Sequence, residues 1–162
     1  MVCWLAGVLA VLMAACGTLN PSHNSGCSYA IIVRQFPTCM ELIRWDIPPD
    51  NRFSLSFIHS VSGTPVRDDY EVVDGLIIQV ASVFETHEAG LPSLEQEPDA
   101  INWEYHDGRF LLRLRRPISQ LVMRTDRRYH NRLTLNTVIH DLNQWDDQAL
   151  ELVIEPCSNR IH

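Results

Sequence analysis

Hydrophobic and polar residues alternate with a period of two along most of this chain. Alternation of this kind, together with many β-branched and aromatic residues, predicts β-strands rather than helices. No segment keeps a helical period beyond about two turns, and only residues 136–145 are expected to hold a short helix or a capping turn. The predicted strands span residues 30–33, 42–47, 53–61, 66–73, 76–84, 101–106, 110–114, 119–124, 133–139 and 149–155.

The dipeptide Asp107-Gly108 is the strongest turn signal in the chain, because it lies between two alternating runs. It predicts a two-residue type I′ hairpin that pairs Tyr105 with Phe110 and Trp103 with Leu112. We expect these four aromatic and aliphatic side chains to form one side of the core.

Other turns follow at regular intervals, including Asp74-Gly75 between two further strands. Successive hairpins of this kind form a meander, and a sheet with one apolar face needs a second layer to cover it. The chain is also long and apolar enough for one packed core. The sequence therefore predicts a mostly β fold, an antiparallel β-sandwich or partly closed barrel in a single domain.

The segment from Phe53 to Val72 contains an ionisable pair on an otherwise apolar face. A four-residue turn at residues 62–65 would fix the antiparallel register of the two flanking strands. In that register the directly opposed pairs are His59 with Asp68, Phe57 with Tyr70 and Leu55 with Val72.

An opposed His59 and Asp68 would lie close enough for the imidazole to hydrogen-bond the carboxylate. Such a pair can act as an acid-base dyad in which the carboxylate fixes the histidine tautomer. Ser60 points to the other face of its strand, and no Gly-x-Ser-x-Gly motif is present, which argues against a serine hydrolase. We favour a structural interpretation, in which the pair is a satisfied polar contact that holds the hairpin in register.

Residues 1–15 contain a continuous apolar run that ends in small residues. The run is shorter than the roughly 20 residues of a spanning helix and suits a signal peptide. Residues 12–16, Leu-Met-Ala-Ala-Cys, resemble a bacterial lipobox, so we expect Cys16 to carry a lipid. An uncleaved signal anchor is the alternative, and it would leave the domain on the same side of the membrane.

This interpretation divides the chain into four parts. Residues 1–15 are a signal peptide, residues 16–26 a polar tether, residues 27–157 the β domain and residues 158–162 a tail. We expect the protein to be exported and lipid-anchored on the extracytoplasmic face, in the periplasm or at the outer membrane.

Processing at Cys16 would remove Cys3 and leave three thiols in an oxidising compartment. Cys27 and Cys39 flank a predicted hairpin in positions that do not face each other, so either one pairs more easily with Cys157. The sequence leaves both bonds open. We expect the remaining thiol to be a small buried hydrophobe, and the spacing does not match a zinc site.

The net charge of −7 disfavours binding to nucleic acid or to anionic lipid. An arginine cluster around one strand pair can bind a carboxylate, although surface ion pairs are the simpler explanation. Its members are Arg113, Arg115, Arg116, Arg124, Arg127 and Arg128. The loop at residues 86–99 is long and acidic, which is typical of partner surfaces and of solvated loops alike.

A metal site would have to combine His59 and Asp68 with the adjacent His87 and Glu88. Adjacent side chains diverge on an extended backbone, so this set is not diagnostic, and we expect neither a metal nor a cofactor. The other histidines are scattered along the chain, at His23, His106, His130, His140 and His162.

Two short motifs carry a family resemblance. They are His59-Ser60-Val61, followed by Thr64-Pro65-Val66, Asp68 and Tyr70, and the later loop Ala89-Gly90-Leu91-Pro92. These motifs resemble the bacterial domain of unknown function 1850 family, in which a glycine precedes the loop where Glu88 stands here. The resemblance implies a small exported or lipid-anchored protein with no assigned catalytic residue. It also implies an accessory role beside tripartite transporters that use a solute receptor to import organic acids.

The leading hypothesis is a lipid-anchored, non-catalytic binding or interaction module. Its expected partners are membrane transporter subunits or a solute-binding protein, with the membrane reached through Cys16. The expected ligand or partner surface comprises His59, Ser60, Asp68, Tyr70, Glu88, Gly90, Leu91 and Pro92. The alternative is a small metal-dependent or acid-base enzyme centred on His59 and Asp68.

Overall fold

The computed structural model describes residues 27–85 and 97–157 of the chain. Within these ranges the regular structure consists of β-strands and two turns of 3-10 helix. The strands are β1 (Tyr29–Gln35), β2 (Met40–Asp46), β3 (Arg52–Ile58), β4 (Pro65–Val73), β5 (Leu76–Phe84), β6 (Ala100–His106), β7 (Arg109–Ile118), β8 (Leu121–Arg124), β9 (Arg132–Leu135), β10 (Val138–Asp141) and β11 (Ala149–Pro156). The 3-10 turns are η1 (Arg127–Tyr129) and η2 (Leu142–Trp145). No helix in the described ranges has the length and apolar character needed to cross a bilayer.

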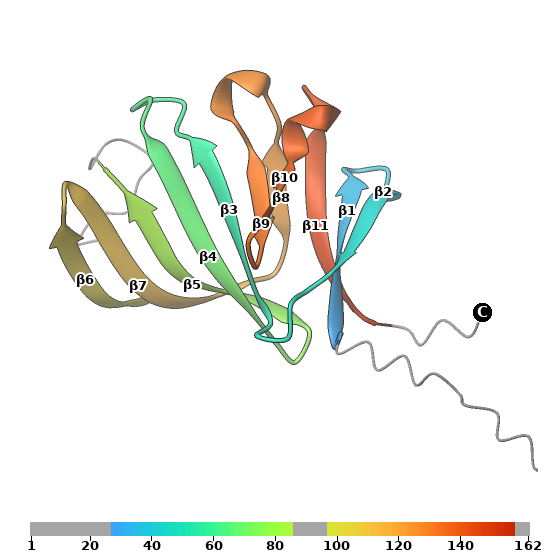
Figure 1. Ribbon diagram of the computed structural model, residues 1–162, viewed down its shortest axis with the longest axis horizontal. Helices are drawn as coiled ribbons and strands as arrows, with labels where there is room; N and C mark the ends of the chain where they lie inside the picture. The colour runs from blue at the N-terminus through green and yellow to red at the C-terminus, as the bar shows by residue number, and fades with distance from the viewer. Residues whose placement is uncertain (1–26, 86–96, 158–162) are drawn as a thin grey trace, which may run out of the picture.

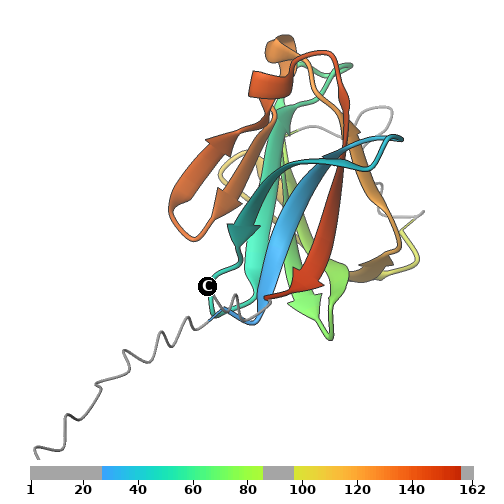
Figure 2. The same ribbon diagram turned by 90° about the vertical axis from the view of Figure 1, so that its right-hand side faces the viewer.

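The strands form two antiparallel sheets that pack face to face. The smaller sheet has the order β2-β1-β11-β8, and the larger has the order β10-β9-β3-β4-β5-β7-β6. Figure 1 shows the larger sheet extending away from the smaller sheet, with β6 and β7 at the far left and β1 and β2 at the right, and Figure 2 gives the same fold turned by 90°. The predicted antiparallel sandwich is thus confirmed, and neither sheet forms a closed barrel.

The main core lies between the two sheets. Ile31 of β1 and Leu150 of β11 are fully buried against Leu55 of β3 and Leu133 of β9. Because alternate residues of a strand point to opposite faces, the residues between these core positions face outward. A second apolar cluster lies farther along the larger sheet, on β4, β5 and β7, and contains Val66, Phe84, Leu112 and Leu114.

The Asp107-Gly108 turn forms as predicted. Both residues have positive φ, 50° and 76°, and the hairpin pairs Tyr105 with Phe110 and Trp103 with Leu112. The expectation that Tyr105 belongs to the core is wrong, because its exposed fraction is 66%. β6 is the outermost strand of its sheet, so its side chains have a neighbouring strand on one side only.

The terminal strand β11 pairs with β1, which brings Cys157 beside Cys27, and these two residues form a disulfide. Of the two bonds that the sequence left open, this is the one present. The remaining thiol in the described part of the chain, Cys39, is exposed in the β1–β2 turn. The expectation of a buried free thiol is therefore wrong, since a hairpin turn gives the side chain no core to enter.

One predicted strand, residues 133–139, is two strands. Asn136 adopts a positive φ of 55° and turns the chain, so β9 and β10 form a short hairpin at the edge of the larger sheet. The short helix or capping turn expected within residues 136–145 is present as the four-residue 3-10 turn η2, which the Asp141 carboxylate caps by accepting from the Asn143 N–H.

Candidate functional site

The hairpin of β3 and β4 does not adopt the register expected from the sequence. Phe53 lies opposite Tyr70, Leu55 opposite Asp68 and Phe57 opposite Val66. The predicted opposition of His59 with Asp68, Phe57 with Tyr70 and Leu55 with Val72 is wrong. β3 also ends at Ile58 rather than continuing to Val61.

The turn begins two residues earlier than predicted. The His59 N–H donates to the Thr64 carbonyl at 2.9 Å, and the Gly63 N–H donates back to the His59 carbonyl at 2.9 Å. Residues 60–63 therefore form the loop, in place of residues 62–65. Gly63 has a φ of +69°, a conformation that glycine adopts without the steric cost that other residues incur.

The imidazole of His59 is engaged within this turn. Its Nδ1 accepts from the Ser62 N–H at 3.3 Å and lies 3.2 Å from the Ser62 hydroxyl, which is 2.8 Å from the Thr64 hydroxyl. Because the backbone N–H is a donor, Nδ1 acts as an acceptor. His59 thus closes the turn that it begins, much as a capping side chain closes the end of a helix.

Asp68 lies four residues farther along the hairpin from His59. It faces Leu55, and four residues of extended strand span about 13 Å. The two side chains therefore do not form a dyad. One part of the prediction is confirmed. Asp68 and Tyr70 point to the same side of the sheet as Leu55 and Phe53.

Asp68 lies on the inner face of the larger sheet, between the two apolar clusters, with Ser82 directly opposite it on β5. Its Oδ1 accepts from the Ser82 hydroxyl at 2.7 Å, and a second hydrogen bond comes from Gln79. Burial raises the pKa of Asp68 above its usual value, and the nearby Asp69 adds to the rise. The two hydrogen bonds and Arg116 oppose this effect without cancelling it.

Of the predicted surface residues that the structure describes, Tyr70 is the most deeply buried. Only 5% of its surface is exposed, and its ring stacks on Phe53 with a centroid distance of 4.9 Å. Burial, together with the charges of Asp68 and Asp69, raises the pKa of its hydroxyl well above the usual value. Tyr70 thus contributes to the core rather than to a contact surface.

The remaining predicted residues fall into two groups. Ser60 is exposed in the turn after His59. The residues Glu88, Gly90, Leu91 and Pro92, together with His87 and the expected lipidation site Cys16, lie outside the described residues.

One set of potential metal ligands comes together in the described part of the chain. Cys27, Asp46 and Cys157 bring their ligand atoms within 4.8 Å of one another. The two sulfurs are bonded to each other in the disulfide, so the Asp46 carboxylate is the one ligand that this set can offer.

The predicted arginine cluster is divided between both faces and two sheets. Arg116 points inward and forms ion pairs with Glu97 and with Asp99, the latter at 2.9 Å. Arg113 is paired outward with Glu104 at 3.0 Å, and Arg115 is exposed. The others pair with neighbouring acids, as Arg124 with Asp147, Arg127 with Asp146 and Arg128 with Asp126. Surface ion pairs therefore account for most of this cluster.

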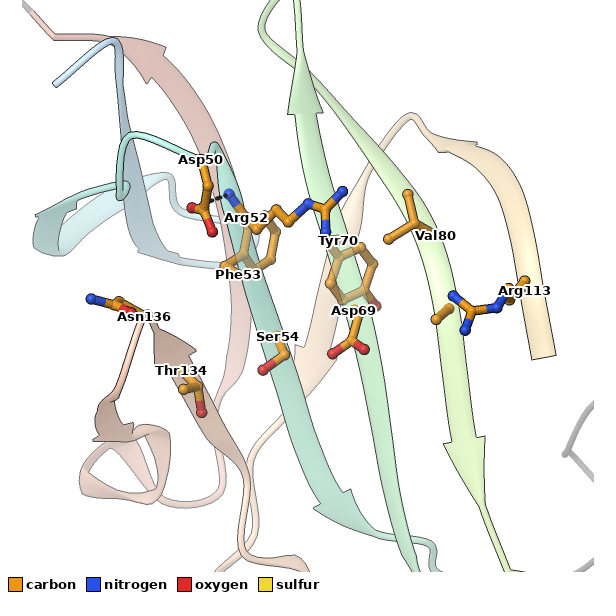
Figure 3. A pocket seen from close by; sticks show the side chains of 11 residues that line it. Asp50, Arg52, Phe53, Ser54, Asp69, Tyr70, Val80, Arg113, Thr134 and Asn136 are labelled. Atoms are coloured by element: carbon orange, nitrogen blue, oxygen red, sulfur yellow. Dashed lines mark hydrogen bonds between the residues drawn. The ribbon is translucent and has the colours of Figure 1, made fainter. Parts of the chain in front are cut away.

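A shallow trough crosses the outer face of the larger sheet, on the side away from the smaller sheet (Figure 3). One cross-strand row forms its floor. Neighbours in this row are directly opposed on β9, β3, β4, β5 and β7, and they are Thr134, Ser54, Asp69, Ala81 and Arg113. The row hollows the surface because three of its members have small side chains, whereas the adjacent position on β3 carries Arg52.

The trough, here called the outer trough, has a volume of about 370 Å³. Its lining residues are Asp50, Arg52, Phe53, Ser54, Asp69, Tyr70, Val80, Ala81, Arg113, Thr134 and Asn136. The pattern of the sequence does not predict this trough. Its residues are separated by up to about half of the chain, and they converge only once five strands are aligned. The sequence signal available was the small, polar outward residue at each of positions 54 and 134.

A family model described as Domain of unknown function (DUF1850) matches residues 53–142. The match covers almost all of the seven-stranded sheet, from β3 to β10, and extends over more than half of the chain. No curated protein and no solved structure gives a significant match. The family resemblance inferred from the motifs around His59 is thereby confirmed, and the chain belongs to the DUF1850 family.

Proposed function

We propose that this domain is a non-catalytic binding or interaction module, held on the extracytoplasmic face of a membrane by a lipid on Cys16. The observation that carries the proposal is the separation of His59 from Asp68. Each forms its own local hydrogen bonds, His59 with Ser62 and Asp68 with Ser82. The pair therefore lacks the direct contact by which a carboxylate orients a catalytic imidazole.

The partner surface in this proposal is the end of the sandwich that carries the β3–β4 turn. That turn projects at one end, whereas β1 begins at the opposite end (Figure 1). A chain anchored ahead of β1 would direct the turn away from the bilayer. At the turn, Val61 exposes 65% of its surface, which suits contact with an apolar patch on a partner.

The partner class comes from the family resemblance. Membrane transporter subunits or a solute-binding protein of a tripartite transporter would meet an anchored module at the membrane surface. The acidic balance of the chain, −7, favours a basic patch on such a partner.

Affinity capture from membranes of the native host, in mild detergent, tests the proposal. The wild-type chain should recover transporter subunits or a solute-binding protein, and Val61→Asp should lose them. Val138→Asp is the matched control, because Val138 is similarly exposed, at 56%, on edge strand β10. Recovery of no membrane or receptor protein by the wild-type chain would contradict the proposal.

The acid-base enzyme is retained as a second candidate because of one observation. Asp68 is a carboxylate in a largely apolar face with a raised pKa, a combination found at catalytic acids. Its test is the pair His59→Gln and Asp68→Asn. If both variants fold and keep full biological activity in the host, the enzyme is excluded.

A further inference from the structure

The outer trough contains hydrogen-bonding groups that no protein group engages. Among the residues that the structure describes, the side chains of Arg52, Ser54 and Thr134 form no hydrogen bond or ion pair. Ser54 lies directly between Thr134 and Asp69 in the cross-strand row. One guanidinium and two hydroxyl groups are therefore available on the same face, over two adjacent strands.

The acidic groups of the trough are already engaged. Arg67 binds both carboxylate oxygens of Asp69, at 3.0 and 3.1 Å, and an Asp50 oxygen accepts from the Arg52 backbone N–H at 3.2 Å. Among the described residues that line the trough, Arg52 is thus the cation without an ion pair, because Arg113 is paired with Glu104.

Figure 3 shows how these groups are arranged across the sheet. The Arg52 side chain extends from β3 toward β4, and Arg113 extends from β7 on the far side of Val80. Ser54 and Thr134 lie on the opposite side of Asp69 from Arg113. A ligand seated here meets guanidinium groups over one half of the trough and hydroxyl groups over the other.

From this arrangement we infer that the outer trough binds a small organic carboxylate that also carries hydroxyl groups. The carboxylate is held by the planar fork of Arg52, with Arg113 on the far side, because guanidinium geometry matches two carboxylate oxygens. The ligand hydroxyls bond Ser54 and Thr134. Nothing in this inference depends on the β3–β4 turn, so it goes beyond the proposed interaction module.

Size and charge narrow the ligand class. The trough volume of about 370 Å³ lies at the small end of ligand sites. The carboxylates of Asp50 and Asp69 line the same trough, and like charges this close penalise a dianion more than a monoanion. A monocarboxylate is therefore preferred over inorganic phosphate.

Isothermal titration of the full-length chain in mild detergent tests the inference with defined probes. These are gluconate, galacturonate and glycerate as hydroxy monocarboxylates, propionate as a bare carboxylate, glucose as a neutral polyol, and inorganic phosphate. At least one hydroxy carboxylate should bind saturably and more tightly than the other three probes. Absence of saturable binding by all three hydroxy carboxylates, up to tens of millimolar, would overturn the inference.

Variants assign the binding to the trough. Arg52→Gln should weaken the best hydroxy carboxylate about tenfold or more, the scale expected for a charge-assisted pair. Arg115→Gln is the matched control, an exposed arginine of the same face that does not line the trough, and it should change the affinity less than about twofold. Equal losses in the two variants would indicate general electrostatic attraction and overturn the site.

Two further variants test the part of the trough that carries the hydroxyl groups. Ser54→Ala and Thr134→Val should weaken the hydroxy carboxylate severalfold while leaving propionate binding unchanged. Circular dichroism and the thermal midpoint of each variant show that the sheet remains folded. The same variants should still capture the membrane partner, because the outer trough and the β3–β4 turn are separate surfaces. Failure of the ligand site can therefore be distinguished from failure of the interaction module.

Discussion

The carboxylate of Asp68 accepts a 2.7 Å hydrogen bond from the hydroxyl of Ser82, across from β5 to β4 on the inner face of the larger sheet. This bond lies between the two apolar clusters that make up the interior. A carboxylate in such surroundings loses solvation, and two hydrogen bonds compensate in part. The inner face thus contains a polar group whose charge works against folding.

Asp68→Asn should raise stability at neutral pH. The folded-state pKa of Asp68 lies above its unfolded value. The stability that the protonated side chain contributes is therefore fully present below the unfolded pKa and is lost as pH rises through the folded pKa. The amide oxygen can still accept from Ser82 and carries no charge. We expect a gain of about 1 kcal/mol at pH 7 that shrinks toward pH 4, measured by urea unfolding.

The neighbouring Asp69→Asn is the control for that experiment. Its carboxylate is paired with Arg67 on the outer face, where exposed ion pairs contribute about 0–1 kcal/mol. A loss of stability in Asp68→Asn that stays constant between pH 4 and pH 7 would contradict the assignment of a buried, unfavourable charge.

His59→Ala should destabilise the domain by about 1 kcal/mol, because it removes the acceptor for the Ser62 N–H. His59→Asn should recover most of the loss, since its side-chain oxygen can occupy the position of Nδ1. Ser60→Ala, at the exposed adjacent residue, serves as the control. Urea midpoints compare the four proteins, and equal stability of the alanine and asparagine variants would refute the capping role.

Loss of the Cys27–Cys157 disulfide should lower the free energy of unfolding by about 2–4 kcal/mol. The bond joins residues 130 positions apart and ties the first strand to the last. Cys27→Ser combined with Cys157→Ser makes the change, and Cys39→Ser should alter stability by less than about 0.5 kcal/mol because Cys39 is exposed. Chemical unfolding in the absence of reductant measures both, and comparable losses would point to a different pairing.

Gly108→Ala should cost about 1 kcal/mol for conformational reasons alone. Gly108 has a φ of +76°, and an added Cβ would meet no atom within 4 Å. Gly108→Asn should lose less, because asparagine tolerates the left-handed region. Thermal unfolding distinguishes the three proteins, and an alanine variant as stable as the wild type would mean that the turn relaxes to another type.

The register of the β6–β7 hairpin was predictable because a two-residue Asp-Gly turn fixes its flanking pairs. The β3–β4 hairpin was not. Its connecting residues allow a four-residue loop at either 60–63 or 62–65, and moving the loop by two residues leaves every side chain on the same face. The alternation of apolar and polar residues predicted that Asp68 lies on the buried face of the sheet. It contained no information on which residue lies opposite Asp68.

The outer trough could not be predicted from the sequence, for a different reason. Its row depends on a bulge at Val80, where the pairing of β5 with β4 and with β7 shifts register. A bulge inserts an extra residue and reverses the alternation locally. Without that shift, Ala81 and Arg113 cannot be assigned to the same row as Asp69 and Ser54.

The most direct test of the interaction module is site-directed photo-crosslinking in membranes of the native host, with the crosslinker at position 61 in the β3–β4 turn and, as control, at position 138 on β10. We expect position 61 to give a specific adduct with a transporter subunit or a solute-binding protein, and position 138 to give none. No protein adduct at position 61, or identical adducts at both positions, would contradict an interaction surface at the β3–β4 turn.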